Sequence, residues 1–130
     1  MTTIKEVFGT DKPIIALLHL RALPGDPHFP HGGKMGDVLS AARADLKALQ
    51  DGGVDGILIS NEFSLPYLDH VDMVTPSAMA YIIGQLRSEI TVPFGVHVIS
   101  DADATIELAA AVEAQFVRSV FTGAYVSEIG

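Results

Sequence analysis

The feature that most constrains this chain is an alternation between short apolar runs and longer stretches in which apolar residues have helical spacing. The apolar runs lie at residues 13–20, 54–59, 93–99 and 116–121, and a helical pattern separates each run from the next. The first run, PIIALLHL, is almost wholly apolar, which predicts a strand covered on both faces. Buried strands that alternate with amphipathic helices favour a parallel sheet with right-handed crossovers.

Three helices are expected between the four strands. Apolar residues recur at helical steps from Met35 to Leu49, and Gly52-Gly53 then offers a left-handed stop for the first helix. The second helix is expected to open at Thr75-Pro76, with the threonine as its N-cap and the proline at the first helical position. The third is expected to start at Ser100, with Asp103 completing a variant of the capping box.

The connections that follow the strands are longer than those that precede them. The loops after the first two strands, residues 21–33 and 60–74, are long and contain proline, glycine and acidic residues, whereas only a few residues lead from each helix into the next strand. The irregular, polar parts of the chain therefore gather at the carboxyl ends of the strands. In barrels and in open parallel sheets, that end carries the functional site.

Chain length and missing motifs bear on whether the sheet is open or closed. An open, doubly wound sheet of four strands is physically reasonable, but 130 residues are also about half of the roughly 250 that a complete β/α barrel needs. Neither a Gly-x-Gly-x-x-Gly loop nor a Walker-type loop follows the first strand, so no nucleotide fingerprint is present and no cofactor is expected. The open-sheet alternative thereby loses its usual functional support.

Several segments carry a resemblance to a known family. In order along the chain they are FGTDKPIIALLHLRALPGDPHF, GGVDGILISNEFSLPY and PFGVHVISDADATIELAAAVEAQFVRSVFTGAYVSEIG, and they resemble the BtpA/SgcQ family from about Phe8 to Gly130. The most specific parts are the loop that begins at His19-Leu20 and the motif Phe121-Thr122-Gly123-Ala124-Tyr125.

The resemblance implies a TIM-type barrel protein of about twice this length. We therefore expect residues 1–130 to be a single α/β domain, the N-terminal half of such a barrel, with four parallel strands and three helices and without the last four βα units.

Two residues are candidates for catalysis. His19 lies near the end of the first strand, where an imidazole suits general acid or base chemistry because imidazoles titrate near neutral pH. Glu62 follows the second strand, where a carboxylate suits proton transfer. The alternatives are a structural histidine bonded to a loop carbonyl and a strand-end carboxylate that faces solvent.

Four further residues are candidates for substrate binding: Asn61, His97, Arg118 and Thr122. The amide of Asn61 suits the orientation of a hydroxyl-bearing substrate. His97 is either a buried neutral histidine of the core or a side chain that points into the barrel beside His19. Arg118 is a charge within an apolar strand, so it either holds a phosphate or carboxylate of a substrate or pairs with a core acid such as Glu62. Thr122 offers a hydroxyl in the turn after the fourth strand.

A metal site is the less favoured interpretation of the same residues. His19, Glu62 and His97 together would make a His/His/carboxylate set of the kind that binds zinc or iron. No His-x-His or His-Glu-x-x-His spacing supports that set, and the absence of cysteine excludes thiolate ligands. We therefore expect no metal.

Composition limits the partners. The formal net charge of −8 disfavours nucleic acid and anionic membrane surfaces. No apolar run reaches the roughly 20 residues that a membrane-spanning helix needs, and the N-terminus lacks the layout of a signal peptide, so a cytoplasmic protein without direct membrane insertion is expected. A half-barrel would leave strand edges unpaired, which favours a homodimer or another association through those edges.

Three functions stay open at this point. The first is an enzyme that acts on a small sugar or sugar phosphate, in line with the family's association with sugar-utilisation genes of enteric bacteria. The second is a non-catalytic assembly factor, since the resemblance also includes cyanobacterial proteins implicated in photosystem I biogenesis. The third is a truncated, inactive fragment.

Overall fold

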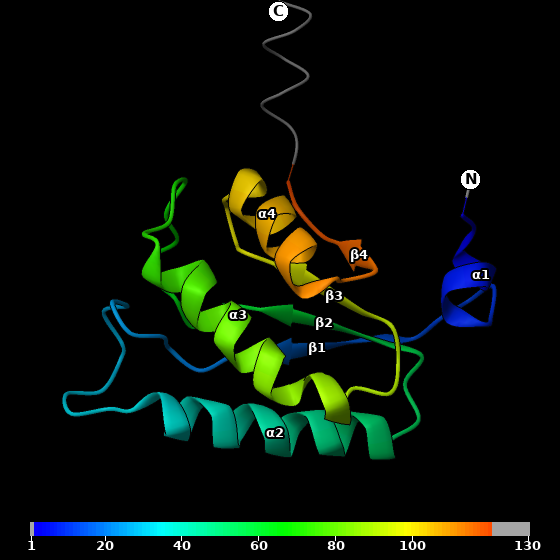
Figure 1. Cartoon of the computed structure of the whole chain (residues 1–130), viewed down its shortest axis with the longest axis horizontal. Coiled ribbons are helices and arrows are strands. Elements are labelled where there is room, and N and C mark those ends of the chain that lie inside the picture. The colour runs from blue at the N-terminus through cyan, green and yellow to red at the C-terminus, as the bar shows by residue number, and fades with distance from the viewer. Residues whose placement is uncertain (1, 121–130) are drawn as a thin grey trace, which may run out of the picture.

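The computed structural model describes residues 2–120 and contains one sheet of four parallel strands (Figure 1). The strands lie side by side in chain order, and each pairs in register with the next. Their bounds are β1 Ile15–His19, β2 Gly56–Ser60, β3 Phe94–His97 and β4 Phe116–Val117. The helices are α1 Ile4–Phe8, α2 Met35–Asp51, α3 Val74–Leu86 and α4 Ala102–Val112, with a short 3₁₀ turn at Arg87–Glu89.

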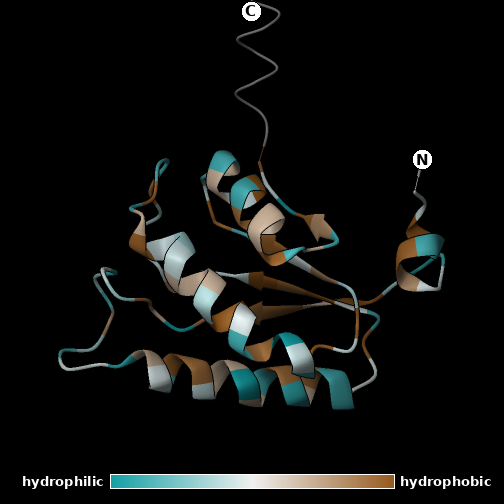
Figure 2. Ribbon diagram, in the orientation of Figure 1, coloured by the Kyte–Doolittle hydropathy of each residue, from teal (hydrophilic) through white to brown (hydrophobic). Residues whose placement is uncertain are grey.

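The helices α2, α3 and α4 form one layer over one face of this sheet (Figure 1). The core lies between the two layers, and the strands are among the most hydrophobic parts of the molecule (Figure 2). Its largest fully buried side chains come from both layers and include Leu18, Leu20, Leu46, Ile57, Ile59, Met79, Ile82, Ile83, Phe94 and Val96. The parallel strands and alternating helices confirm what the apolar runs predicted, and their arrangement, with the helices on one side, is like the half-barrel that the family resemblance implied.

The burial of β1 differs from the prediction. The first strand was expected to be covered on both faces, but Ile15 and Leu17 are 38% and 43% exposed. Leu18, which points to the opposite face and packs beneath the helices, is 1% exposed. Successive side chains of a strand point to opposite faces, and the helices cover only one face of this sheet. The uninterrupted apolar run therefore reflects a second face that no element among residues 2–120 covers at β1.

The helix starts also differ in detail. Helix α1 was not predicted, and its N-cap Thr3 forms a capping box with Glu6. Helix α3 begins one residue before Thr75. At α4 the N-cap is Asp101, whose side chain accepts from the Ala104 N–H, and not Ser100 as expected.

Two aromatic rings cover the amino-terminal part of the sheet face opposite the helices. Phe8 of α1 and Phe116 of β4 meet edge to face, with ring centroids 5.3 Å apart. A Cβ added at Gly56 would lie 2.7 Å from the Phe8 ring, and one added at Gly95 would lie 2.4 Å from the Phe116 ring. The rings thus lie directly against glycines of β2 and β3, near the amino-terminal ends of these strands. The polar residues lie at the opposite, carboxyl ends of the strands.

Candidate functional site

The last residues of β1, β2 and β3 form one row across the sheet. In the register of the strands, His19 pairs with Ser60, and Ser60 pairs with His97. Residues paired in this way point to the same face, and the position before each of them packs into the core beneath the helices. The row His19–Ser60–His97 therefore lies on the face away from the helices, at the carboxyl ends of the strands.

Each member of this row has a buried side-chain atom that lacks a hydrogen-bond partner among residues 2–120: His19 Nε2, Ser60 Oγ and His97 Nε2. Ser60 is fully buried and His97 is only 6% exposed. Buried polar groups are nearly always hydrogen-bonded, because an unpaired one costs about 1–3 kcal/mol. The row therefore lacks hydrogen-bond partners within residues 2–120, and its three atoms in neighbouring positions are candidate contacts for a polar ligand.

Arg118 follows β4 and fixes the ring of His97. Its Nε donates to His97 Nδ1 over 3.1 Å. A guanidinium has only donors, so Nδ1 is the unprotonated nitrogen and the neutral ring carries its proton on Nε2. Burial and, second, the positive charge of Arg118 lower the pKa of His97, while the charge of Glu62 acts in the opposite direction. His97 therefore presents a neutral Nε2–H donor to the row.

His19 and Glu62 form the second pair of the site. Glu62 lies just after the buried end of β2, and its Oε2 is 3.9 Å from His19 Nε2. The side chains of His19 and Glu62 are 36% and 38% exposed, so they lie at the border between the row and solvent. An imidazole and a carboxylate at this separation suit the transfer of a proton to or from a bound molecule.

Asn61 occupies a different position from its neighbours in sequence. Its side chain is 1% exposed, and its Oδ1 accepts from the Ile99 N–H over 2.8 Å. That bond ties the end of β2 to the segment that follows β3. The contact seen for Asn61 is thus with the protein backbone, and it holds two of the loops beside the row together.

Two acids bind the same loops to each other. Asp26, in the loop after β1, accepts from the Ser64 hydroxyl over 2.6 Å and from the Leu23 N–H over 2.7 Å. Asp101, besides capping α4, accepts from the Val71 N–H over 2.9 Å. The loops that follow β1, β2 and β3 are therefore cross-linked by buried or half-buried carboxylates, which gives the site a fixed frame.

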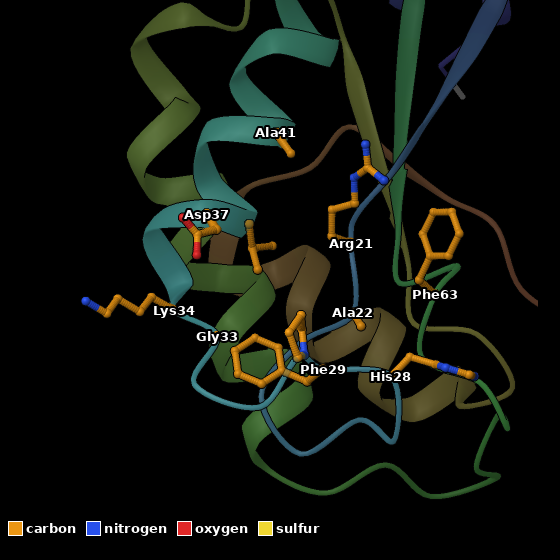
Figure 3. A pocket seen from close by; sticks show the side chains of 11 residues that line it. Arg21, Ala22, His28, Phe29, Gly33, Lys34, Asp37, Ala41 and Phe63 are labelled. Atoms are coloured by element: carbon orange, nitrogen blue, oxygen red, sulfur yellow. The ribbon is translucent and has the colours of Figure 1, made fainter.

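A hollow of about 400 Å³ lies on the outer side of the loop that follows β1 (Figure 3). Phe29 and the loop line one part of it, Asp37 and Ala41 of α2 line another, and Arg21 and Phe63 close it towards the sheet (Figure 3). A second hollow of about 380 Å³ continues along β1 and is lined by Leu17, His19, Arg21, Asp45, Ala48, Leu49 and Phe63. Both lie beside β1, which pairs only with β2 in the described sheet.

The structure therefore brings four of the predicted site residues together, namely His19, Glu62, His97 and Arg118, whereas the Asn61 side chain accepts from the Ile99 N–H. Arg118 is bonded to His97, so of its two alternatives the ion pair with Glu62 is not formed within residues 2–120. Thr122 lies outside the described residues.

Ser60 was not predicted. Its signal was available in the alternation of the strand, because it lies two positions before Glu62 and, in a parallel register, opposite both histidines.

Two kinds of feature are absent from residues 2–120. No group of three or more His, Cys, Asp and Glu side chains is placed to hold a metal ion in this part of the chain, so His19, Glu62 and His97 are not assembled as a metal-binding set. No helix in the same range is long and apolar enough to cross a bilayer.

Comparison with known proteins gives consistent matches over this whole region. The model of the BtpA family matches residues 10–130. The sgc region protein SgcQ of Escherichia coli is 55% identical over 130 residues, which are 100% of this chain and 48% of that protein. The photosystem I biogenesis protein BtpA of Synechocystis is 34% identical over 128 residues, which are 96% of this chain and 44% of that protein.

The matches extend to archaea. An uncharacterized protein of Thermococcus kodakarensis is 31% identical over 121 residues, which are 92% of this chain and 46% of that protein. The chain thus spans about half the length of the curated relatives it matches. No solved structure gives a significant match.

Proposed function

We propose that this chain, which belongs to the BtpA family, contributes the acid–base half of an enzyme site for a small sugar or sugar phosphate. The observation that carries the proposal is the row of three buried, unpartnered polar atoms on His19, Ser60 and His97. They lie at the carboxyl ends of parallel strands, where α/β proteins bind their ligands.

The residues have different parts in this proposal. Glu62 and His19 exchange a proton with the ligand, because both side chains are partly exposed and Glu62 Oε2 lies 3.9 Å from His19 Nε2. Ser60 and His97 are buried and bind the polar groups of the ligand. A molecule with several hydroxyl groups suits the row, since hydroxyl groups both donate and accept hydrogen bonds.

The test is a panel of sugars and sugar phosphates, screened by the thermal shift of the chain. We expect at least one compound to stabilise the wild-type chain, and its binding to weaken about tenfold or more in His19→Ala and Glu62→Gln, as loss of one charge-assisted hydrogen bond predicts. His70→Ala and Asp69→Asn are matched controls, because both residues are exposed in the loop after β2. The proposal fails if no compound shifts the transition or if the site variants bind as the controls do.

An assembly role is the second candidate, and the similarity to the photosystem I biogenesis protein BtpA of Synechocystis supports it. Exposed apolar side chains in the loop after β2 would serve such a role, since Leu65 and Leu68 are 42% and 48% exposed and Met73 is 86% exposed. The triple variant Leu65→Ser, Leu68→Ser, Met73→Ser separates the two functions. Sugar binding that survives this change but depends on Glu62 supports the enzyme, whereas a protein complex that the wild type forms and the triple variant loses, with no sugar bound by either, supports the assembly role.

We further propose that two copies of the 130-residue chain associate through β1. This strand has one free edge in the described sheet, its residues Ile15 and Leu17 are exposed, and the two hollows lie beside it. An unpaired, apolar strand edge is an efficient template for pairing. Light scattering on the eluted chain is expected to give twice 13.8 kDa for the wild type and a monomer for Leu17→Lys. A monomeric wild type would rule this association out.

A further inference from the structure

The proposed function assigns proton transfer to His19 and Glu62, so Ser60 and His97 have no part in that step. They are neighbours in the register of β2 and β3, and both are more than nine-tenths buried. Each has an unpartnered polar atom, Ser60 Oγ and His97 Nε2. Because the two atoms lie on adjacent strands, a single polar group of the ligand could bind both of them.

The chemistry of these atoms defines that feature. His97 Nε2 carries the ring proton, because Nδ1 is occupied by the Arg118 N–H, so this atom only donates. The Ser60 hydroxyl also has a proton to donate. Adjacent strands are about 4.8 Å apart, and a hydrogen bond spans about 2.8 Å, so one oxygen atom between the two side chains is within reach of both. The complementary group is therefore an acceptor, and a negatively charged oxygen is the strongest acceptor.

We infer that Ser60 and His97 form a subsite for one ligand oxygen that is negatively charged or becomes so during the reaction, with Arg118 as the positioning residue for the His97 ring. The inference deepens the proposed function and rests on it. The ligand oxygen belongs to a carboxylate or to the carbonyl group of a sugar.

For a carbonyl ligand the step balances without any further reactant. The carboxylate of Glu62 takes a proton from the carbon next to the carbonyl, and the electron pair of that C–H bond forms a C=C bond. The carbonyl π pair moves to the oxygen, which becomes an enolate and accepts from Ser60 and His97. Return of the proton to carbon restores both the carbonyl group and the Glu62 carboxylate. Donors fixed before the charge develops are the main source of stabilisation in such steps.

The first test reads the His97 ring directly in the free chain. The ¹⁵N NMR shifts of its two ring nitrogens at pH 7 are expected to show protonated Nε2 and unprotonated Nδ1, and Arg118→Met is expected to change the balance between the two tautomers. A ring protonated at Nδ1, or at both nitrogens, in the wild type would overturn the inference, because the donor would then be absent or of a different kind.

The second test uses glycolate, a small hydroxy carboxylate, as the probe. Titration is expected to shift the His97 resonances of the wild type in a saturable way, and calorimetry, which does not depend on that ring, is expected to show binding weakened about tenfold in His97→Leu and in Ser60→Ala. His97→Gln is the matched rescue, because its side-chain N–H lies near the position of Nε2 and should restore binding to within about threefold of the wild type. Absence of glycolate binding, or equal binding by His97→Leu and the wild type, would refute the subsite.

The two proposals fail in different ways. If glycolate binds through Ser60 and His97 but Glu62→Gln and His19→Ala leave the response to every sugar unchanged, the subsite stands and the acid–base assignment falls. If sugars bind and depend on Glu62 while Ser60→Ala has no effect on either ligand, the enzyme stands and the subsite falls. Far-UV circular dichroism of each variant separates these outcomes from simple unfolding.

Discussion

Replacement of Asp101 by alanine tests the frame that holds the site loops. The Asp101 carboxylate accepts two backbone hydrogen bonds, one from Ala104 at the start of α4 and one from Val71 in the loop after β2. The side chain is 7% exposed, so water does not readily replace either bond. Loss of an N-cap costs about 1 kcal/mol. Loss of a second bond to a charged acceptor costs about 1.5 kcal/mol.

The sum predicts that Asp101→Ala lowers the free energy of unfolding by about 2–3 kcal/mol. The matched control is Asp103→Ala, because Asp103 lies in the first turn of the same helix, is exposed and makes no capping bond. That control should lose no more than about 0.5 kcal/mol, from its interaction with the helix dipole. Urea unfolding followed by far-UV circular dichroism measures both values.

The two variants distinguish the cap seen in the structure from the one expected from sequence. A loss below about 0.5 kcal/mol for Asp101→Ala, or an equal loss for Asp103→Ala, would refute the reasoning. A normal m-value with a lowered midpoint is also required, since a changed m-value would indicate a change in compactness and not the loss of two bonds.

Three further predictions concern the row and the rings beneath it. Arg118→Met should raise the pKa of His97, because it removes a positive charge next to the ring, and an NMR titration with an unchanged midpoint would contradict this. Because the pKa of His97 is lowered in the folded chain, the unfolded chain binds the proton more readily, and the free energy of unfolding should fall as the pH drops below about 6.5. Urea unfolding at pH 5 and pH 7 should show a smaller difference for His97→Gln than for the wild type. Gly95→Ala should cost about 1–3 kcal/mol, because its Cβ would lie 2.4 Å from the Phe116 ring, and Phe116→Leu in the same chain should recover part of that loss.

The strand and helix order was predictable because each element leaves a local pattern. The apolar run at residues 13–20 and the helical spacing from Met35 to Leu49 correspond to β1 and α2. Helix α1 escaped notice because five residues are too few to show a helical period, although Thr3 and Glu6 have the spacing of a capping box. The expected cap of α4 was wrong because Ser100 has a φ of 69°, which differs from the extended backbone of an N-cap residue, and the sequence does not show that angle.

The site was harder to predict than the fold, because it depends on which residues are opposite each other. The sequence pointed to His19 and Glu62 through their positions after strands, and they do lie 3.9 Å apart. The bond between Arg118 and His97 joins residues 21 positions apart and follows only from the register of β3 and β4. The strand alternation places Ser60 on the same face as Glu62, but a serine at the end of a strand is common, and only the register shows it between two histidines.

The most direct measurement of the central claim is a crystal structure of the chain grown with the sugar or sugar phosphate that gives the largest thermal shift. The account predicts ligand oxygens within hydrogen-bond distance of His19 Nε2, Ser60 Oγ and His97 Nε2, the three atoms that have no partner among residues 2–120. A ligand bound in the hollow of Figure 3, with the row bonded to other parts of the protein, would contradict it.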